Sequence, residues 1–351
     1  MPRSLHPDEF LHFPGVILDV RSPGEYDLGH IPGAVSFPLF TNEERAEVGL
    51  CYKQQGRDQA VELGFAIAGP KCHYFVTQAK ALAADHSVQV HCWRGGMRSE
   101  AIAWILSMAG LDVSVLIGGY KAFRRWVRNT FECSKTVIIL GGMTGTGKTA
   151  ILSALAAQGA QILDLERLAN HRGSSYGHLG LPAQPTNEQF ENVLAIDWDQ
   201  LDPNQPVWIE AESKRIGICR IPDPIFRQMD RAAVIEATRP RSERLTALVN
   251  LYGTADRQAL ITATERIRKR LGGLRTQQAI ECLRQGNLID ACDIILDYYD
   301  KTYTYDLQRR NVPIYPVDVT GLTADASAAL LLEKLEQISA KLSSPDRLIQ
   351  V

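Results

Sequence analysis

The sequence predicts two consecutive α/β domains, each built around a mainly parallel sheet, with a helical part near the end of the second. From Gly15 to Trp126 short apolar runs alternate with longer stretches of helical periodicity, and the same alternation resumes at Thr136. Strands that alternate with helices form parallel sheets covered by helices. Apolar periodicity is lost over residues 127–135. The predicted parts are a first domain at 1–128, a linker at 129–135 and a second domain at 136–351.

In the first domain, three short apolar runs predict buried strands. A longer segment, SEAIAWILSMAG, has helical spacing and ends at Gly110, a residue type that favours helix C-termini. The predicted strands are VILDV (16–20), VQVHC (88–92) and VSVLI (113–117).

The second domain contains five runs that predict strands of a second parallel sheet. Residues 255–310 differ from this pattern, because their helical spacing is broken at Gly272 and Gly273 and they concentrate basic side chains. Such a cluster is either a solvated helix end or a surface that contacts RNA or phosphate. The predicted strands are TVIILGG (136–142), QILDL (161–165), VWIEA (207–211), AVIEA (233–237) and VPIYPVDV (312–319).

Composition excludes several classes of protein. With 45% hydrophobic and 22% charged residues and a net charge of -2, the chain is an ordinary globular protein, and nucleic-acid binding would depend on local basic patches. No apolar run approaches the ~20 residues of a membrane span, and the first residues lack the apolar core of a secretory signal. The seven cysteines form no C-x-x-C pair, which argues against a disulfide framework or zinc ribbon. We expect a cytoplasmic protein.

A cysteine loop is the first candidate site. Cys92 ends a predicted strand and is followed by WRGGMRS and a predicted helix. Glycines let backbone N–H groups turn inward, arginines add positive charge, and the helix presents its positive end. Such a loop binds an anion and lowers the pKa of the thiol, whereas a buried packing cysteine needs none of these neighbours. The candidate catalytic residues are Cys92, Arg94 and Arg98, and the anion loop adds Gly95, Gly96 and Ser99.

Two segments on either side of this loop resemble the rhodanese fold. They are DVRSPGEYDLGHIPGA (19–34) and IGGYKAFRRW (117–126), so the resemblance covers the first third of the chain. It implies that Cys92 carries a chalcogen or acts on a chalcogen–phosphorus compound, and that Asp19, Arg21 and His30 are architectural. Five residues separate Cys92 from Arg98, one more than is usual in sulfurtransferases of this fold and the same as in dual-specificity phosphatases. We expect a loop sized for a phosphate-like anion.

The second candidate site is the segment GMTGTGKT (142–149), which lies between a predicted strand and a predicted helix as a Walker A motif requires. Its backbone N–H groups can wrap a diphosphate, its lysine supplies a positive charge, and its last threonine can bind Mg²⁺. Arg172, in a loop after the second strand, is a further donor that either contacts the diphosphate or satisfies its own loop. The predicted diphosphate-binding residues are Gly142, Gly145, Thr146, Gly147, Lys148, Thr149 and Arg172.

Acidic residues that could hold Mg²⁺ follow the strand VWIEA. Glu210 and Glu212 share one strand face if the strand extends that far, and they are equally consistent with a structural role. His171 and His178 lack a clear third ligand, so no other metal site is predicted.

Four segments taken together resemble the tRNA 2-selenouridine synthase family: HCWRGGMRSEAIAWIL, GGMTGTGKT, LERLANHRGSSYG and YYDKTY (298–303). This resemblance implies a transferase that converts wobble 2-thiouridine of tRNA into 2-selenouridine. Geranyl diphosphate would alkylate the sulfur at the P-loop domain, and selenophosphate would then exchange selenium at the cysteine loop. Cys92 would attack phosphorus, carry selenium as a perselenide or orient the donor.

The partners implied by the resemblance are tRNA carrying wobble 2-thiouridine and an enzyme that supplies selenophosphate, with Mg²⁺ as a candidate cofactor. The basic cluster and the segment RPRSER (239–244) are candidates for the tRNA-binding surface. The candidate tRNA-binding residues are Arg241, Arg244, Arg266, Arg268, Lys269, Arg270 and Arg275.

Two other functions fit the same motifs. In an ATP-dependent tRNA sulfurtransferase, the P-loop would activate the base and Cys92 would deliver persulfide sulfur. In a phosphatase or regulatory protein of the rhodanese fold, the loop from Cys92 to Arg98 would bind a phosphoester. The P-loop would then act as a nucleotide switch.

Overall fold

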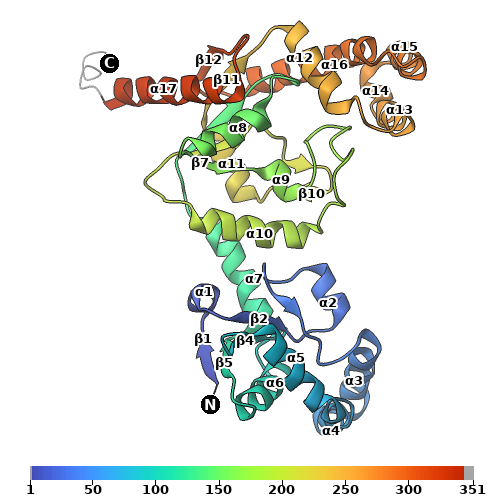
Figure 1. The fold of residues 1–351 in the computed structure, drawn as a ribbon, viewed down its shortest axis with the longest axis vertical. Helices are drawn as coiled ribbons and strands as arrows, with labels where there is room; N and C mark the ends of the chain where they lie inside the picture. Colours follow the sequence, from blue (N-terminus) through green and yellow to red (C-terminus); the bar gives the residue numbers. More distant parts are fainter. Residues whose placement is uncertain (1, 344–351) are drawn as a thin grey trace. The chain divides into compact units, whose positions relative to one another are not determined.

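The computed structural model describes residues 2–343, and the chain divides into two compact units (Figure 1). Unit 1 extends to Phe131 and also takes in Glu188–Ile196. Unit 2 consists of Glu132–Asn187 and the chain from Asp197 onward. The predicted linker at 129–135 includes the point after Phe131 where unit 1 gives way to unit 2. The sequence analysis, however, placed Glu188–Ile196 in the second domain. No helix among the described residues is long and apolar enough to cross a membrane.

Unit 1 contains a five-stranded parallel sheet in the order β1-β5-β4-β2-β3. The three predicted strands are confirmed as β2, β4 and β5. The other two strands have three and two residues, which is too short for a hydrophobic period to be recognised. The strands are β1 (Arg3–Leu5), β2 (Val16–Asp19), β3 (Val35–Ser36), β4 (Ser87–His91) and β5 (Asp112–Leu116).

Helices α5 and α6 contribute buried apolar residues to the core on this sheet, whereas α3 has no buried residue. Strand β4 is central and ends at His91, so the cysteine loop begins at the carboxyl edge of the sheet, where parallel α/β folds place their sites. The predicted helix after this loop is confirmed as α6. The helices are α1 (Pro7–His12), α2 (Pro23–Leu28), α3 (Asn42–Gln55), α4 (Arg57–Ala68), η1 (Gly69–Lys71), α5 (Cys72–Leu82), α6 (Met97–Met108) and α7 (Gly119–Thr130).

Unit 2 contains a second five-stranded parallel sheet, in the order β12-β11-β6-β8-β7. All five predicted strands are confirmed. Central strand β6 runs into the P-loop, and strands β7 and β8 are neighbours, so the residues that follow each of them meet at one edge. The strands are β6 (Val137–Gly141), β7 (Gln161–Leu163), β8 (Val207–Glu210), β11 (Ala233–Thr238) and β12 (Ile314–Asp318); β9 (Arg215–Ile216) and β10 (Cys219–Arg220) form a small antiparallel ribbon.

The predicted helical part of unit 2 is confirmed, and it has an apolar core of its own. Helices α13, α15 and α16 contribute buried leucines and alanines to this core, which also receives Tyr176 and Leu179 from the loop after β7. The helices are α8 (Lys148–Ala157), α9 (Leu165–Ala169), α10 (Asn187–Gln200), α11 (Asp223–Arg231), α12 (Arg241–Tyr252), α13 (Arg257–Arg266), α14 (Arg268–Leu271), α15 (Gly273–Arg284), α16 (Leu288–Arg309) and α17 (Ala324–Ser343).

Candidate functional site

The cysteine loop surrounds the thiol of Cys92 with donors. Sγ accepts hydrogen bonds from the Ser99 hydroxyl at 3.2 Å and from the Gly96 N–H at 3.4 Å, and the side chain is only 3% exposed. Burial by itself raises the pKa of Cys92, but the hydrogen bonds from Ser99 and Gly96 and the charge of Arg98 outweigh it and lower the pKa below its ordinary value. The arrangement favours a nucleophilic thiolate.

The conformation of this loop depends on glycine and on the start of helix α7. Gly95 adopts φ +64°, and a Cβ atom there would lie 2.6 Å from the Leu116 carbonyl oxygen. The Tyr120 N–H donates to the Cys92 carbonyl at 2.8 Å, and the Lys121 N–H donates to the Trp93 carbonyl at 2.9 Å. The segment that carries the rhodanese resemblance after β5 therefore holds the backbone of the cysteine loop.

The two arginines of the loop differ in their surroundings. Arg98 is half-buried, and its guanidinium donates to Glu25 of α2 at 2.9 Å. Arg94 is exposed. The structure thus gathers Gly96, Arg98 and Ser99 around the thiol, while the side chain of Arg94 extends to the surface beside the loop.

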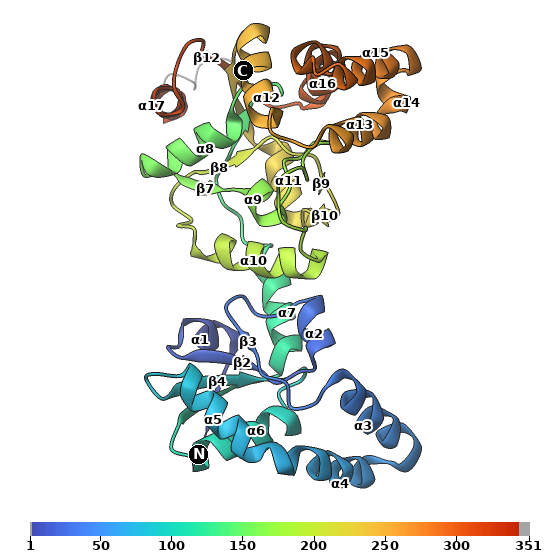
Figure 2. The same cartoon turned by 45° about the vertical axis from the view of Figure 1, so that its right-hand side comes forward.

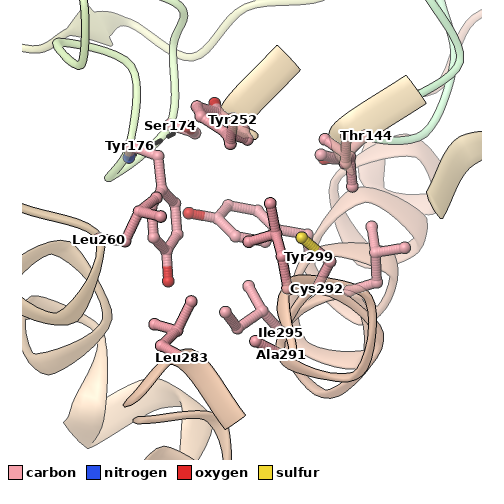
Figure 3. Close-up of a pocket in the computed structure, with 13 residues that line it drawn as sticks. Thr144, Ser174, Tyr176, Tyr252, Leu260, Leu283, Ala291, Cys292, Ile295 and Tyr299 are labelled. Atoms are coloured by element: carbon pink, nitrogen blue, oxygen red, sulfur yellow. Dashed lines mark hydrogen bonds between the residues drawn. The ribbon is translucent and has the colours of Figure 1, made fainter. Parts of the chain in front are cut away.

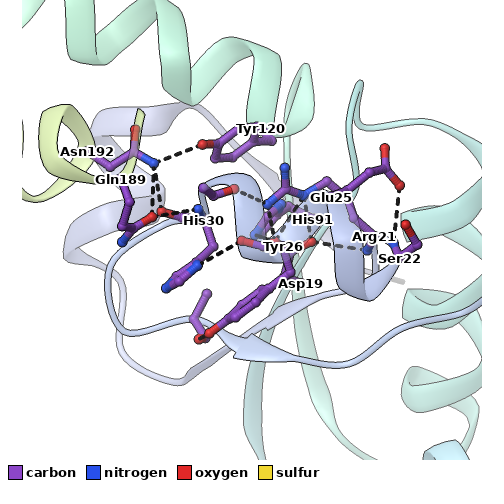
Figure 4. Close-up of polar contacts among 12 residues, drawn as sticks. Asp19, Arg21, Ser22, Glu25, Tyr26, His30, His91, Tyr120, Gln189 and Asn192 are labelled. Carbon is purple, nitrogen blue, oxygen red and sulfur yellow. Dashed lines mark hydrogen bonds and ion pairs between the residues drawn. The ribbon is translucent and has the colours of Figure 1, made fainter. Parts of the chain in front are cut away.

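A buried ionic network lies next to the loop (Figure 4). Arg21 donates to Asp19 at 2.9 Å and to the Gly29 carbonyl at 2.7 Å, and its guanidinium stacks 3.8 Å from the ring of Tyr120. Asp19, Arg21 and His91 have no exposed surface. Because a buried charge costs free energy unless it is paired, these contacts fix the strand ends that carry the loop. The architectural role expected for Asp19 and Arg21 agrees with this geometry.

The same network explains why Glu188–Ile196 groups with unit 1. The His30 N–H donates to the Gln189 side chain at 2.8 Å, and the buried Asn192 amide donates to the His30 carbonyl at 2.9 Å (Figure 4). Tyr120 donates to Glu188 at 2.8 Å. These are polar contacts between segments far apart in the chain, and they leave no signal in hydrophobic periodicity.

The lowered pKa of Cys92 leads to a prediction for its alkylation. We expect the rate of modification by iodoacetamide to reach half its plateau at a lower pH than for an ordinary thiol, because the lowered pKa of Cys92 lets the thiolate persist as the pH falls. In Ser99→Ala protein the midpoint should move upward, since one hydrogen bond that favours the thiolate is lost. The comparison uses protein in which the other six cysteines are serine. A midpoint at or above the ordinary value would contradict this account of the loop.

In unit 2 the P-loop adopts the conformation that its glycines permit. Gly142, Gly145 and Gly147 all have positive φ angles, which residues with a side chain rarely adopt. The Thr146 hydroxyl donates to the Met143 carbonyl at 2.7 Å, and Lys148 Nζ donates to the Gly142 carbonyl at 3.0 Å. The lysine charge therefore lies across the mouth of the loop. The predicted diphosphate-binding residues of 142–149 form one loop around it.

Helix α16 braces the P-loop through the segment YYDKTY. The Gly142 N–H donates to the Tyr303 hydroxyl at 2.7 Å. Arg244 donates to the Thr144 carbonyl at 3.1 Å and forms a two-pronged ion pair with Asp300, each hydrogen bond being 2.8 Å long. These side chains hold the loop in place from outside the Walker A motif.

The structure corrects part of the predicted tRNA surface. Arg244 is 4% exposed, so the prediction of a surface contact fails for it. Arg241 pairs with Asp293 and Asp297, and Arg275 pairs with Asp297, so acids of α16 balance both charges. Arg275 is itself exposed. The other exposed basic residues of the predicted surface are Arg266, Arg268, Lys269 and Arg270, of which Arg268 pairs with Glu265 and Arg270 donates to Tyr298.

Three carboxylates meet beside the P-loop. Oxygen atoms of Glu166, Glu210 and Glu212 lie within 4.8 Å of one another, and the Thr149 hydroxyl donates to Glu166 at 3.3 Å. Burial and mutual repulsion raise the pKa of Glu166 to about 8 and the pKa values of Glu210 and Glu212 to about 7. Glu210 Oε1 is buried without a hydrogen-bond partner among the described residues. Oxygen ligands with this charge and spacing fit a divalent cation.

The sequence analysis identified Glu210 and Glu212 but missed Glu166. Glu166 lies in the segment LERLANHRGSSYG directly after β7, so its place after a neighbouring strand was the available signal. Within residues 2–343 no second such cluster of acids, histidines or cysteines occurs. The rings of His171 and His178 stack on each other, with their centroids 6.4 Å apart.

Arg172 is bound within its own loop in this structure. Its guanidinium donates to the Leu179 carbonyl at 2.8 Å, inside its own loop, so the structure favours the alternative in which the loop satisfies itself. The loop is anchored to the helical part through Ser175. Its N–H donates to the Tyr299 hydroxyl, and its hydroxyl donates to the Ala263 carbonyl.

An apolar cavity of about 40 Å³ lies between this loop and the helical part (Figure 3). It reaches the P-loop at Thr144, and the rings of Tyr176, Tyr252 and Tyr299 form much of its wall. The remaining lining is Ser174, Leu248, Leu260, Leu283, Leu288, Ala291, Cys292, Ile295 and Leu296. A small, aromatic and aliphatic cavity thus adjoins the loop that is predicted to bind a diphosphate.

Comparison with known proteins agrees with both units. Residues 135–328 match the family model described as tRNA 2-selenouridine synthase AAA domain, and residues 8–125 match the rhodanese-like domain. Three similar proteins are each called tRNA 2-selenouridine synthase. The one from Bordetella petrii is 35% identical over 84% of this chain and 87% of its own; that from Marinobacter nauticus is 34% identical over 84% and 89%. The protein from Hahella chejuensis is 36% identical over 84% and 86%.

Proposed function

The chain belongs to the tRNA 2-selenouridine synthase family, and we propose that it converts wobble 2-thiouridine of tRNA into 2-selenouridine in two steps. Unit 2 alkylates the sulfur with geranyl diphosphate, and unit 1 exchanges the alkylated sulfur for selenium with selenophosphate. The observation that carries the first step is the tyrosine-lined apolar cavity that adjoins the P-loop at Thr144.

In the first step the thiocarbonyl sulfur of the base forms a bond to C1 of the geranyl group as the allylic C–O bond breaks. Diphosphate leaves, and the base loses its N3 proton. The P-loop N–H groups and Lys148 stabilise the negative charge that develops on the diphosphate. Aromatic rings stabilise the positive charge that develops on the allylic carbons, and Tyr176, Tyr252 and Tyr299 provide such rings next to the loop.

The cavity suits a hydrocarbon chain better than a nucleotide base. Its wall is aliphatic and aromatic, whereas recognition of a base requires polar groups that pair with its edge. A volume of about 40 Å³ is too small for a ten-carbon chain, so we expect helices α13, α15 and α16 to separate when the chain enters. This consideration favours geranyl diphosphate over ATP at the P-loop.

A divalent cation fits the acids beside the P-loop. Glu166, Glu210 and Glu212 would hold it together with the Thr149 hydroxyl, and their oxygens are the ligands that Mg²⁺ prefers. When bound, the ion supplies positive charge to the diphosphate oxygens. Without it, the raised pKa values of the three acids mean that they retain protons near neutral pH.

In the second step the cysteine loop receives selenophosphate. Selenium bonds to C2 of the base, and geranyl thiol departs as the C2–S bond breaks. Water then cleaves the P–Se bond, so that phosphate leaves and N3 regains a proton. The Gly96 N–H, Arg98 and Arg94 provide positive surroundings for the phosphate part, and the low pKa of Cys92 keeps a thiolate within the loop. An enzyme that supplies selenophosphate is the expected partner.

The surroundings of Glu25 weaken the phosphatase alternative. A phosphatase needs a neutral carboxylic acid to protonate its leaving group. Burial raises the pKa of Glu25, but the hydrogen bond and charge of Arg98 outweigh it and lower the pKa below its ordinary value. The acid nearest to the loop arginine is therefore a carboxylate at neutral pH.

The function is tested by analysing nucleosides after reaction of 2-thiouridine tRNA with geranyl diphosphate and selenophosphate. Wild-type protein should yield 2-selenouridine, and Cys92→Ala protein should accumulate S-geranyl-2-thiouridine without 2-selenouridine. Ser107→Ala, a change on α6 away from the loop, serves as the control and should behave as wild type. The proposal fails if neither protein forms the geranylated base and wild type instead transfers sulfur or selenium when ATP is supplied.

The remaining exposed basic cluster predicts a salt-dependent contact with tRNA. Replacing Arg268 and Lys269 together with Ala should weaken tRNA binding and reduce the slope of log Kd against log salt by about 2, since about one counterion is released per phosphate contact. A double variant with the same charge change, Lys80→Ala with Arg231→Ala, removes exposed charges elsewhere and should leave the slope unchanged. Equal slopes in all three proteins would exclude Arg268 and Lys269 from the interface.

A further inference from the structure

Unit 1 contains a large apolar groove that the two proposed chemical steps leave unexplained. Helices α3, α4 and α6 enclose about 1390 Å³, and the pair α3 and α4 lies beside α6 in both views (Figures 1 and 2). Five large hydrophobic side chains line this groove yet remain 50–67% exposed: Leu50, Tyr52, Phe65, Met97 and Trp104. A contiguous exposed apolar surface of this kind marks a binding site.

The groove is continuous with the cysteine loop. Arg94 lies in the segment between Cys92 and α6, Met97 is the first residue of α6, and both line the groove. Met97 also contacts Arg57 of α4, whose guanidinium lies 3.9 Å from the Met97 sulfur. One end of the groove is therefore formed by residues two and five positions after Cys92.

The charges in the groove indicate what kind of ligand it accepts. Four cationic side chains, Arg45, Lys53, Arg57 and Arg94, line it together with one acid, Glu100. A ligand that combines an apolar chain with phosphate groups complements such a surface. Alkylated tRNA has this composition, because the hydrocarbon chain is attached to a base that its own backbone phosphates flank.

We propose that this groove of unit 1 binds the geranyl chain of S-geranyl-2-thiouridine while the cysteine loop acts on C2 of the same base. The inference rests on the proposed function and adds a second site for the hydrocarbon chain, distinct from the cavity beside the P-loop. The groove exceeds the about 300–1,000 Å³ of ordinary ligand pockets, so the chain and part of the flanking nucleotide fit together. Selenium exchange would then select bases that have already been alkylated.

The test uses a synthetic anticodon stem-loop that carries either S-geranyl or S-methyl 2-thiouridine, so it does not depend on the geranylation activity of the chain. Binding is measured by competition in fluorescence anisotropy. Wild-type protein should bind the S-geranyl form at least ten-fold more tightly than the S-methyl form. Trp104→Asp should lose most of this preference, which is measured as the ratio of the two affinities so that any effect of the substitution on both stem-loops cancels.

Met108→Asp is the matched control, because Met108 lies one helical turn further along α6, is also well exposed and does not line the groove. Its preference should equal that of wild type. An unchanged preference in Trp104→Asp protein overturns the proposal. A second result would also overturn it: sedimentation in which wild type is a dimer and Trp104→Asp protein is a monomer. The groove would then be an interface between two copies of this chain.

The outcomes for the groove and for the proposed function are separate. If wild type prefers the S-geranyl stem-loop but forms no geranylated base from geranyl diphosphate, the groove is supported and the first step fails. If wild type forms the geranylated base and 2-selenouridine but binds both stem-loops equally, the groove proposal fails and the two-step function stands.

Discussion

Lys148→Ala protein is expected to lose S-geranylation, with a rate about 10²–10³-fold below that of wild type, which is the usual cost of removing one preorganised charge or donor from a transition state. Lys148 Nζ lies 3.0 Å from the Gly142 carbonyl at the mouth of the P-loop, where the diphosphate would gain negative charge as the allylic bond breaks. The measurement is the initial rate of S-geranyl-2-thiouridine formation, followed by mass spectrometry of nucleosides.

The same variant provides its own control. Tested with tRNA that already carries S-geranyl-2-thiouridine, Lys148→Ala protein should exchange selenium at the wild-type rate, because Cys92 and its loop belong to unit 1. Loss of both steps in a protein that remains folded would contradict the division of labour between the two units. A wild-type rate of geranylation would remove Lys148 from the reaction.

Arg244→Ala is expected to destabilise unit 2 by about 3 kcal/mol, the lower end of the range for breaking a buried ion pair. Arg244 is nearly fully buried, and its loss removes a donor from the Thr144 carbonyl and leaves Asp300 with the more distant Arg241, 3.5 Å away. The lower end applies because the Asp300 side chain is 18% exposed and water can partly replace the arginine. The measurement is urea unfolding followed by tryptophan fluorescence, to which the buried Trp198 and Trp208 of unit 2 contribute.

A surface pair gives the matched control for this prediction. Arg268 and Glu265 form an ion pair 3.2 Å long in the same helical part, but both side chains are more than two-fifths exposed. Arg268→Ala should therefore cost less than about 1 kcal/mol, as exposed pairs do. If both substitutions lower the free energy of unfolding by the same amount, Arg244 does not brace the P-loop in the way the structure indicates.

The sequence does not show which arginines of the helical part are exposed and which are paired with acids, and the reason is physical. A cluster of arginines looks the same in a sequence whether each charge faces solvent or an acid from another helix. Arg241, Arg244 and Arg275 meet acids of α16 that lie more than twenty residues away along the chain. The segment YYDKTY is recognisable in the sequence as part of a family pattern. Its contacts with Gly142, Ser175 and Arg244 depend on how α16 packs and cannot be read from that pattern.

The sequence by itself predicted the longer strands of the two sheets, the cysteine loop and the P-loop, because each has a recognisable pattern within about ten residues: an apolar strand, glycines that permit a turn, and a helix start. The tertiary structure alone decided which distant groups join these loops. Adjacent strands β7 and β8 bring Glu166 to Glu210 and Glu212, and the packing of α3, α4 and α6 opens an apolar groove beside Cys92. Contacts of this kind are set by strand order and helix packing, which local periodicity does not encode.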